Sequence, residues 1–236
     1  MGPNNFRPQE FAGVGARVVR LKGGDPLIFG RGGEECDYLR QRGIAVHVVP
    51  GITAAAGIAA ELGIPLTHRG VATSVRFLTG HCREGGDDPV HVAASMADAG
   101  TTLVVYMGLA TLPALAEALL AAGLNPATPA VAVERGTTAE QRRVFAHLCS
   151  LPQATRTAAL KSPTLVVIGS VVALSPLWPS FSAATVGDLQ CGAAGEGVYW
   201  SSVDALGESH PLLMNKAHAV VVRTTASSPA EVSSGR

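Results

Sequence analysis

The sequence predicts an α/β fold, in which short strands and helices alternate along the chain. Three observations carry this prediction. Short runs rich in Val, Leu and Ile end repeatedly at turns that contain glycine, as buried strands do. Ala- and Leu-rich segments of helical length stand between these runs, and Gly43, Gly63 and Gly123 close them. Hydrophobic residues make up 47% of the 236 residues and charged residues 15%, which excludes a disordered chain and suffices for one or two packed domains.

The first block of elements has the order strand, glycine turn, helix, strand, helix. We expect a strand at residues 17–21, a helix at 34–42, a short strand at 47–49 and an Ala-rich helix at 53–62. Turns that contain glycine or proline separate these elements, which is typical of an α/β domain.

The second block continues the alternation with longer apolar strands. The expected strands are residues 74–79, 102–106, 130–133, 143–147 and 164–168. A helix is predicted at residues 112–122, between the second and third of these strands. We place a domain boundary between the two blocks, near residues 65–69.

The expected organisation therefore has four parts. Residues 1–16 are an irregular N-terminus, 17–66 belong to a first α/β domain and 67–178 form a second one. Residues 179–236 are rich in Ser, Ala and Gly, and we expect them to be mostly disordered, with one short strand at residues 219–222.

Composition excludes several classes of function. The 18 basic residues balance the 18 acidic ones, and no basic stripe is present, so binding to nucleic acid through net charge is disfavoured. No apolar run reaches the roughly 18 residues that a membrane-spanning helix needs. The four cysteines are widely spaced and HxxxH is absent, which predicts neither a disulfide framework nor a metal site.

The strongest local signal is the segment LKGGDPLIFGRGGEE at residues 21–35. Adjacent glycines after a strand let a ligand approach the backbone, and Asp25 follows them at the strand's carboxyl end, where open α/β sheets bind ligands. A tight turn with Asp25 as a helix N-cap is an equally good interpretation. The segment lacks the glycine spacing of a dinucleotide fingerprint, and no GxxxxGK[ST] occurs, so nicotinamide cofactors and P-loop nucleotides are disfavoured.

Two arginines on separate loops could bind carboxylates. Arg31 lies with Glu34 in the glycine-rich segment, and Arg69 follows a proline turn. Solvated surface arginines are the commoner alternative. His68 and His81 could act as bases, although isolated loop histidines are more often structural.

Six segments together resemble one family, the uroporphyrinogen-III C-methyltransferases, in order and in spacing over about residues 17–179. The segments are VVRLKGGDPLIFGRGGEE, VVPGITAAAGIAAELGIPLTHR, SVRFLTGH, LVVYMGLATLP, AVAVERGTTAEQR and KSPTLVVIGSVVALSPLWP. The resemblance implies a two-domain α/β fold with an S-adenosyl-methionine site in the cleft between the domains, and a homodimer. It also implies two methyl transfers to uroporphyrinogen III, a small-molecule tetrapyrrole, to give precorrin-2 on the route to sirohaem and cobalamin.

The same resemblance implies roles for individual residues. Its cofactor contacts, from the segments GGDP, PGITA, YMGL and ERGT, are Gly23, Gly24, Asp25, Ile28, Thr53, Ala54, Met107 and Gly136. Its residues on the substrate side are Arg31, Glu34 and Arg69. The ending VALSPLWP is similar to plant and algal members and implies a chloroplast location, with the cytoplasm as the location of a bacterial protein.

The sequence departs from the family pattern at its start. The GxGPGD loop, the YDxLV segment and the GKR segment are not found, so we expect an incomplete first domain and a truncated form that is inactive or weak alone. Two alternatives stay open: a non-catalytic fragment that only dimerises or binds ligand weakly, and another tetrapyrrole or diphthine-type methyltransferase.

Overall fold

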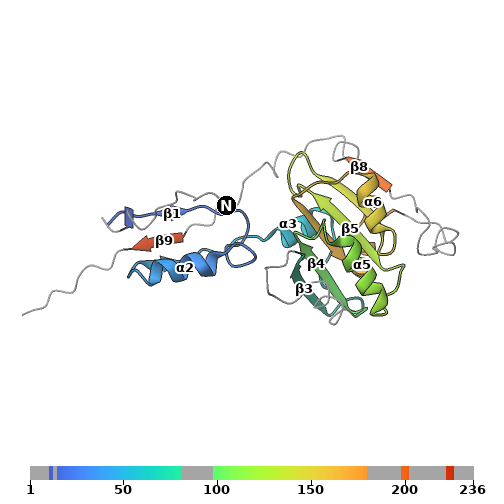
Figure 1. Ribbon diagram of the computed structural model, residues 1–236, viewed down its shortest axis with the longest axis horizontal. Helices are drawn as coiled ribbons and strands as arrows, with labels where there is room; N and C mark the ends of the chain where they lie inside the picture. The colour runs from blue at the N-terminus through green and yellow to red at the C-terminus, as the bar shows by residue number, and fades with distance from the viewer. Residues whose placement is uncertain (1–10, 13–14, 81–97, 180–197, 202–221, 226–236) are drawn as a thin grey trace, which may run out of the picture. The chain divides into compact units, whose positions relative to one another are not determined.

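The computed structural model describes residues 11–12, 15–80, 98–179, 198–201 and 222–225. The chain divides into two compact units (Figure 1). Unit 1 comprises Met1–Thr53 and Lys216–Arg236, and unit 2 comprises Ala54–Asn215. The division thus falls between Thr53 and Ala54, whereas the sequence places the boundary near residues 65–69.

Unit 2 is built on a six-stranded sheet with the order β3-β4-β7-β5-β6-β8. Its strands are β3 (Ser74–Thr79), β4 (Thr101–Tyr106), β5 (Pro129–Glu134), β6 (Arg142–His147), β7 (Thr164–Ile168) and β8 (Val198–Ser201). Only the β3–β4 pair is parallel; the other neighbouring strands are antiparallel. Strand β7 lies between β4 and β5 and runs antiparallel to both. β3, β4 and β5 still share one direction, so their carboxyl ends lie at one edge of the sheet.

Both faces of this sheet are buried, which explains the continuous apolar runs in the sequence. Helices α5 (Leu112–Ala121) and α6 (Leu151–Thr157) pack on one face with alternate strand residues such as Leu103 and Val105. Helix α3 (Ala54–Glu61) and the 3-10 helix η1 (Ser170–Leu174) pack on the other face, against Val104 and the other strand residues on that face.

Unit 1 contains a three-stranded sheet with the order β1-β9-β2. Helix α2 (Gly32–Arg40) joins strands β1 (Val19–Arg20) and β2 (Ala45–His47), and both strands pair antiparallel with β9 (Val222–Thr225). Figure 1 shows β9 beside β1. β1 and β2 are therefore parallel to each other and one strand apart.

Two of the strands come from the segment that the sequence predicts to be mostly disordered. They are β8 and β9; the predicted strand at 219–222 overlaps β9 only at Val222, and residues 219–221 lie outside the described residues. Among the described helices, none is long and apolar enough to span a membrane.

Candidate functional site

In unit 1, Asp25 joins the loops that follow β1 and β2. Its Oδ1 accepts a hydrogen bond from the backbone N–H of Leu27 at 2.8 Å, and its Oδ2 accepts one from that of Gly51 at 3.1 Å. The first bond is that of an Asx turn. Asp25 is thus a turn residue, which agrees with the alternative interpretation of this segment as a tight turn. It is not the N-cap of α2, because Arg31 occupies that position. The carboxylate fixes the GGDP loop against the PGIT loop.

Close backbone packing accounts for part of the glycine-rich segment. Gly32 donates its N–H to the carbonyl of Pro26 at 2.9 Å, and a Cβ at Gly32 would lie 2.4 Å from that oxygen. A Cβ at Gly23 would meet nothing within 4 Å, so this flank of the loop is open. Ile28, another predicted contact, is half-buried in the same loop.

The predicted substrate residues of unit 1 pair with each other. The Arg31 guanidinium contacts the Glu34 carboxylate at 2.6 Å, and the two side chains are 72% and 65% exposed. The hydrogen bond and the charge of Glu34 raise the pKa of Arg31 above its ordinary value. Arg31 also adopts a left-handed φ of 57°. A carboxylate ligand of Arg31 would have to compete with Glu34.

In unit 2, three strands end at one edge of the sheet, and two of the turns there carry predicted cofactor residues. Met107 follows β4, and Gly136 follows β5. Helix α3 begins at Ala54 and reaches the same edge, because the N–H of Ala55 donates to the hydroxyl of Tyr106 at 3.0 Å. Unit 2 therefore brings Ala54, Met107 and Gly136 to one edge.

Met107 stands in strained backbone with an exposed side chain. Its φ is 54°, which L-residues rarely adopt, and 55% of the residue is exposed. Strained backbone of this kind concentrates at functional sites, where the surrounding structure enforces it.

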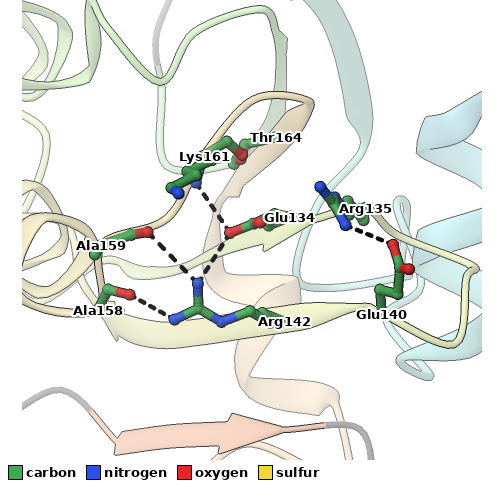
Figure 2. Close-up of polar contacts among 8 residues, drawn as sticks. All are labelled: Glu134, Arg135, Glu140, Arg142, Ala158, Ala159, Lys161 and Thr164. Atoms are coloured by element: carbon green, nitrogen blue, oxygen red, sulfur yellow. Dashed lines mark hydrogen bonds and ion pairs between the residues drawn. The ribbon is translucent and has the colours of Figure 1, made fainter.

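The turn after β5 is strained on both sides of Gly136. Arg135 and Thr137 have φ values of 48° and 63°. A Cβ at Gly136 would lie 2.3 Å from the Ile58 side chain of α3, so glycine is required here by packing within the chain. The N–H of Arg135 donates to the carbonyl of Pro163 at 3.0 Å, and its side chain pairs with Glu140 at 2.5 Å (Figure 2).

A buried carboxylate fixes the end of β5. Glu134 is 5% exposed, and its Oε2 accepts hydrogen bonds from the backbone N–H of Lys161 at 2.9 Å and from Arg142 at 3.2 Å. Arg142 also donates to the carbonyl of Ala158 at the end of α6 (Figure 2). The network anchors the strand from which the Gly136 turn leaves.

Sequence analysis missed three polar residues that hold these loops: Tyr106, Glu134 and Gln141. Each is a polar or aromatic residue at the end of an apolar strand or beside a glycine turn, and that position was the available signal. Their partners are distant in the sequence, so the pairing itself was not visible.

The other residues that the sequence singled out are Thr53, Arg69, His68 and His81. Thr53 belongs to unit 1 and is buried, with 8% exposed. Arg69 is exposed in the turn beside His68, whose Nδ1 lies 2.9 Å from the Arg69 carbonyl oxygen. His81 lies outside the described residues. Within the described part of the chain, no group of three His, Cys, Asp or Glu residues is placed to hold a metal ion.

The family model for tetrapyrrole (corrin/porphyrin) methylases matches residues 9–152. The chain belongs to the tetrapyrrole methylase family. Among its relatives, the S-adenosyl-L-methionine-dependent uroporphyrinogen III methyltransferase, chloroplastic, of Arabidopsis thaliana is 70% identical over 169 residues, which are 72% of this chain and 46% of that protein. A siroheme synthase of Pseudomonas aeruginosa is 53% identical over 165 residues, 70% of this chain and 35% of that protein. The chain thus spans between about a third and a half of the length of these relatives.

Solved methylase structures share the fold. Uroporphyrin-III C-methyltransferase from Thermus thermophilus, in complex with S-adenosyl homocysteine, matches with a TM-score of 0.57 and 40% identity over 66% of this chain and 64% of that one. Cobalt precorrin-4 methyltransferase matches with a TM-score of 0.56 at 21% identity, which shows the fold alone. The predicted family and its α/β fold are confirmed.

Proposed function

We propose that this methylase binds S-adenosyl-methionine and C-methylates uroporphyrinogen III to precorrin-2, in sirohaem biosynthesis. The observation that carries the proposal is the convergence of Ala54, Met107 and Gly136 at one sheet edge: Met107 and Gly136 lie in strained turns, and α3, which begins at Ala54, contacts both. The named activities of the Arabidopsis and Thermus relatives support the same reaction.

The residues of this chain fit such a cofactor. The exposed thioether of Met107 offers apolar surface at a turn whose strain the fold enforces. Gly23 leaves open space beside its loop, and backbone groups at strand ends suit an uncharged or cationic ligand without a metal. When bound, S-adenosyl-methionine supplies a sulfonium methyl group for in-line transfer to a pyrrole carbon.

The contribution of the protein is alignment and exclusion of water. The turns of unit 2 that carry Met107 and Gly136 would hold the donor, and the transfer needs the reacting atoms at about 3–3.5 Å. Arg31 and Arg69 would bind the carboxylates of the substrate, since a guanidinium fork matches a carboxylate. Glu34 would orient Arg31, with which it pairs at 2.6 Å.

The experiment combines binding with turnover. Calorimetry measures the affinity of the purified chain for S-adenosyl homocysteine, and transfer of a labelled methyl group to uroporphyrinogen III measures activity. Asp25→Asn is expected to weaken binding, because an amide cannot accept both backbone bonds. Asp98→Asn is the matched control, since Asp98 also holds a backbone turn, through Gly100 at 2.7 Å, beside the other end of β4.

The outcomes separate the functions left open by the sequence. Binding with turnover supports the methyltransferase, and binding without turnover supports a non-catalytic ligand-binding protein. Absence of both contradicts the proposal. A preference for a precorrin or for diphthine over uroporphyrinogen III in competition assays would favour another methylase.

Location and assembly are further parts of the proposal. We infer a chloroplast location from the Arabidopsis relative, whose name includes it. We also infer a homodimer, which sedimentation of the purified chain tests directly; a monomer across the micromolar range would contradict it.

A further inference from the structure

We propose that Gln141 is a positioning residue of the cofactor site, because it holds the turn at residues 135–137 and helix α3 in one arrangement. The inference rests on the function proposed above, since it concerns the same site. Gln141 does not touch the reacting atoms in this account; it acts through the turn that carries Gly136.

Both ends of the Gln141 amide are used. Its Oε1 accepts the backbone N–H of Thr137 at 2.8 Å, and its Nε2 donates to the carboxylate of Glu61 at 2.7 Å. The residue is 1% exposed. A buried amide that is paired at both ends has one fixed orientation. One side chain therefore joins the turn after β5 to the last residue of α3.

The turn needs this support because its backbone is strained. Arg135 and Thr137 both have positive φ, which residues other than glycine rarely adopt. Gln141 bonds the N–H of Thr137 itself. A Cβ at Gly136 would lie 2.3 Å from Ile58 and 3.3 Å from the Gln141 Oε1, so helix, turn and amide pack without free space between them.

Helix α3 is thereby fastened at both ends to loops that carry predicted cofactor residues. Its first turn is bonded to Tyr106, the residue before Met107, and its last residue is bonded to Gln141. Loss of the Gln141 bonds would release the second end only. The link between α3 and the Gly136 turn would then depend on the packing of Ile58 against that turn.

The surroundings of Glu61 compensate its charge independently of Gln141. Glu61 is exposed, and it faces the positive charge of Arg143 in β6. Burial lowers the pKa of Arg143, and the negative charge of Glu61 opposes this shift. A change at Gln141 therefore leaves the Glu61 carboxylate with a compensating charge.

The test exchanges the donor and the acceptor in the hydrogen bond between Gln141 and Glu61. Q141E keeps an acceptor for Thr137 but places two carboxylates against each other, whereas E61Q keeps an acceptor for Gln141. The double variant Q141E/E61Q restores one donor and one acceptor between the two positions. Q141L removes both bonds of Gln141.

The affinity for S-adenosyl homocysteine is measured by calorimetry at a temperature where circular dichroism shows every variant folded. We expect Q141E and Q141L to weaken binding about ten-fold, E61Q to change it less than about two-fold, and the double variant to recover most of the loss. Unchanged affinity in Q141E and Q141L, with only a lower melting temperature, would show a packing role and overturn the inference. Failure of the double variant to recover would overturn it as well.

Hydrogen exchange separates this inference from the proposed function. Faster exchange of the Thr137 amide in Q141L, which removes the acceptor of that amide, supports the hold on the turn, and unchanged exchange in Q141L contradicts it. If the unaltered chain bound no S-adenosyl homocysteine, the proposed function and the cofactor role of Gln141 would both fall. Exchange at Thr137 would still decide whether Gln141 positions the turn.

Discussion

The two units differ in how their sheets are completed and in how much apolar surface they bury. Unit 2 takes five of its six strands from residues 74–168, and both large core clusters consist of its residues. Unit 1 has two short parallel strands, and a strand from the other end of the chain fills the position between them. Unit 1 therefore depends on a contact that is distant in sequence, whereas unit 2 is stabilised mainly by its own core.

Exposure follows the same division. Of the nine large hydrophobic residues that are exposed among the described residues, seven belong to unit 1. They are Phe11, Val19, Leu21, Leu27, Phe29, Tyr38 and Ile52. Strands β4, β5, β6 and β7 of unit 2 are buried almost throughout, so the two units should respond differently to the same kind of substitution.

The largest expected effect is a proline in β9. Thr224 is the central-strand partner of Val46 in β2, and a proline there removes a backbone N–H from a strand that is paired on both sides. Thr224→Pro should abolish the hydrogen-exchange protection of β1 and β2 while β4, β5 and β7 keep theirs. Thr224→Val, which keeps the backbone N–H, is the control. Equal protection in the two variants would contradict the dependence of unit 1 on β9.

A core substitution in unit 2 should destabilise unit 2 and leave the strands of unit 1 largely unaffected. Phe145 in β6 is fully buried and packs edge-on against Trp178 at 5.9 Å between ring centroids. Phe145→Ala should lower the free energy of unfolding by about 3–5 kcal/mol, because it removes a buried ring and leaves a cavity. Denaturant unfolding followed by tryptophan fluorescence measures this loss, because both tryptophans, Trp178 and Trp200, belong to unit 2. Exchange in β1 and β2 should change little, and a collapse of both units together would refute their independence.

The difference between the units also sets what the sequence could predict. In unit 2, continuous apolar runs bounded by glycines gave β3 at its observed bounds and placed β4, α5, β5, β6 and β7 to within about one residue at each end. Helix α6 was missed, since its seven residues include Pro152 and several polar side chains and show no clear period. In unit 1, β1 is only two residues long, and no local pattern indicates that β9 pairs with it.

The sequence also predicts some features of the candidate site and not others. Glycine turns at strand ends could be recognised from the sequence, because their chemistry is local. The bonds that hold them could not: Gln141 and Glu61 are 80 positions apart, and Asp25 and Gly51 are 26 apart. Such pairs form through tertiary packing, which a local sequence pattern does not reveal.

A smaller loss of stability is expected in unit 2 when the pH falls. His147 in β6 is buried beside Trp178, and burial lowers the pKa of His147 below its ordinary value. Below about pH 6.5 the unfolded chain binds a proton that the folded chain resists, so this residue makes unit 2 less stable as the pH falls. His147→Gln should reduce the fall in melting temperature between pH 7.5 and pH 5.5. His68→Gln, at an exposed site, is the control, and equal falls in the two variants would contradict the assignment.

The smallest effect on stability is expected at the exposed pair of unit 1. Arg31 and Glu34 lie one turn apart at the start of α2, mostly in solvent, where ion pairs contribute little to folding. Arg31→Ala and Glu34→Ala should therefore leave the melting temperature and the affinity for S-adenosyl homocysteine unchanged. Under the proposed function, Arg31→Ala should instead raise KM for uroporphyrinogen III, because a guanidinium partner for its carboxylates is lost. A KM equal to that of the unaltered chain, with the pair removed, would assign Arg31 to the solvated surface that the sequence left as its alternative.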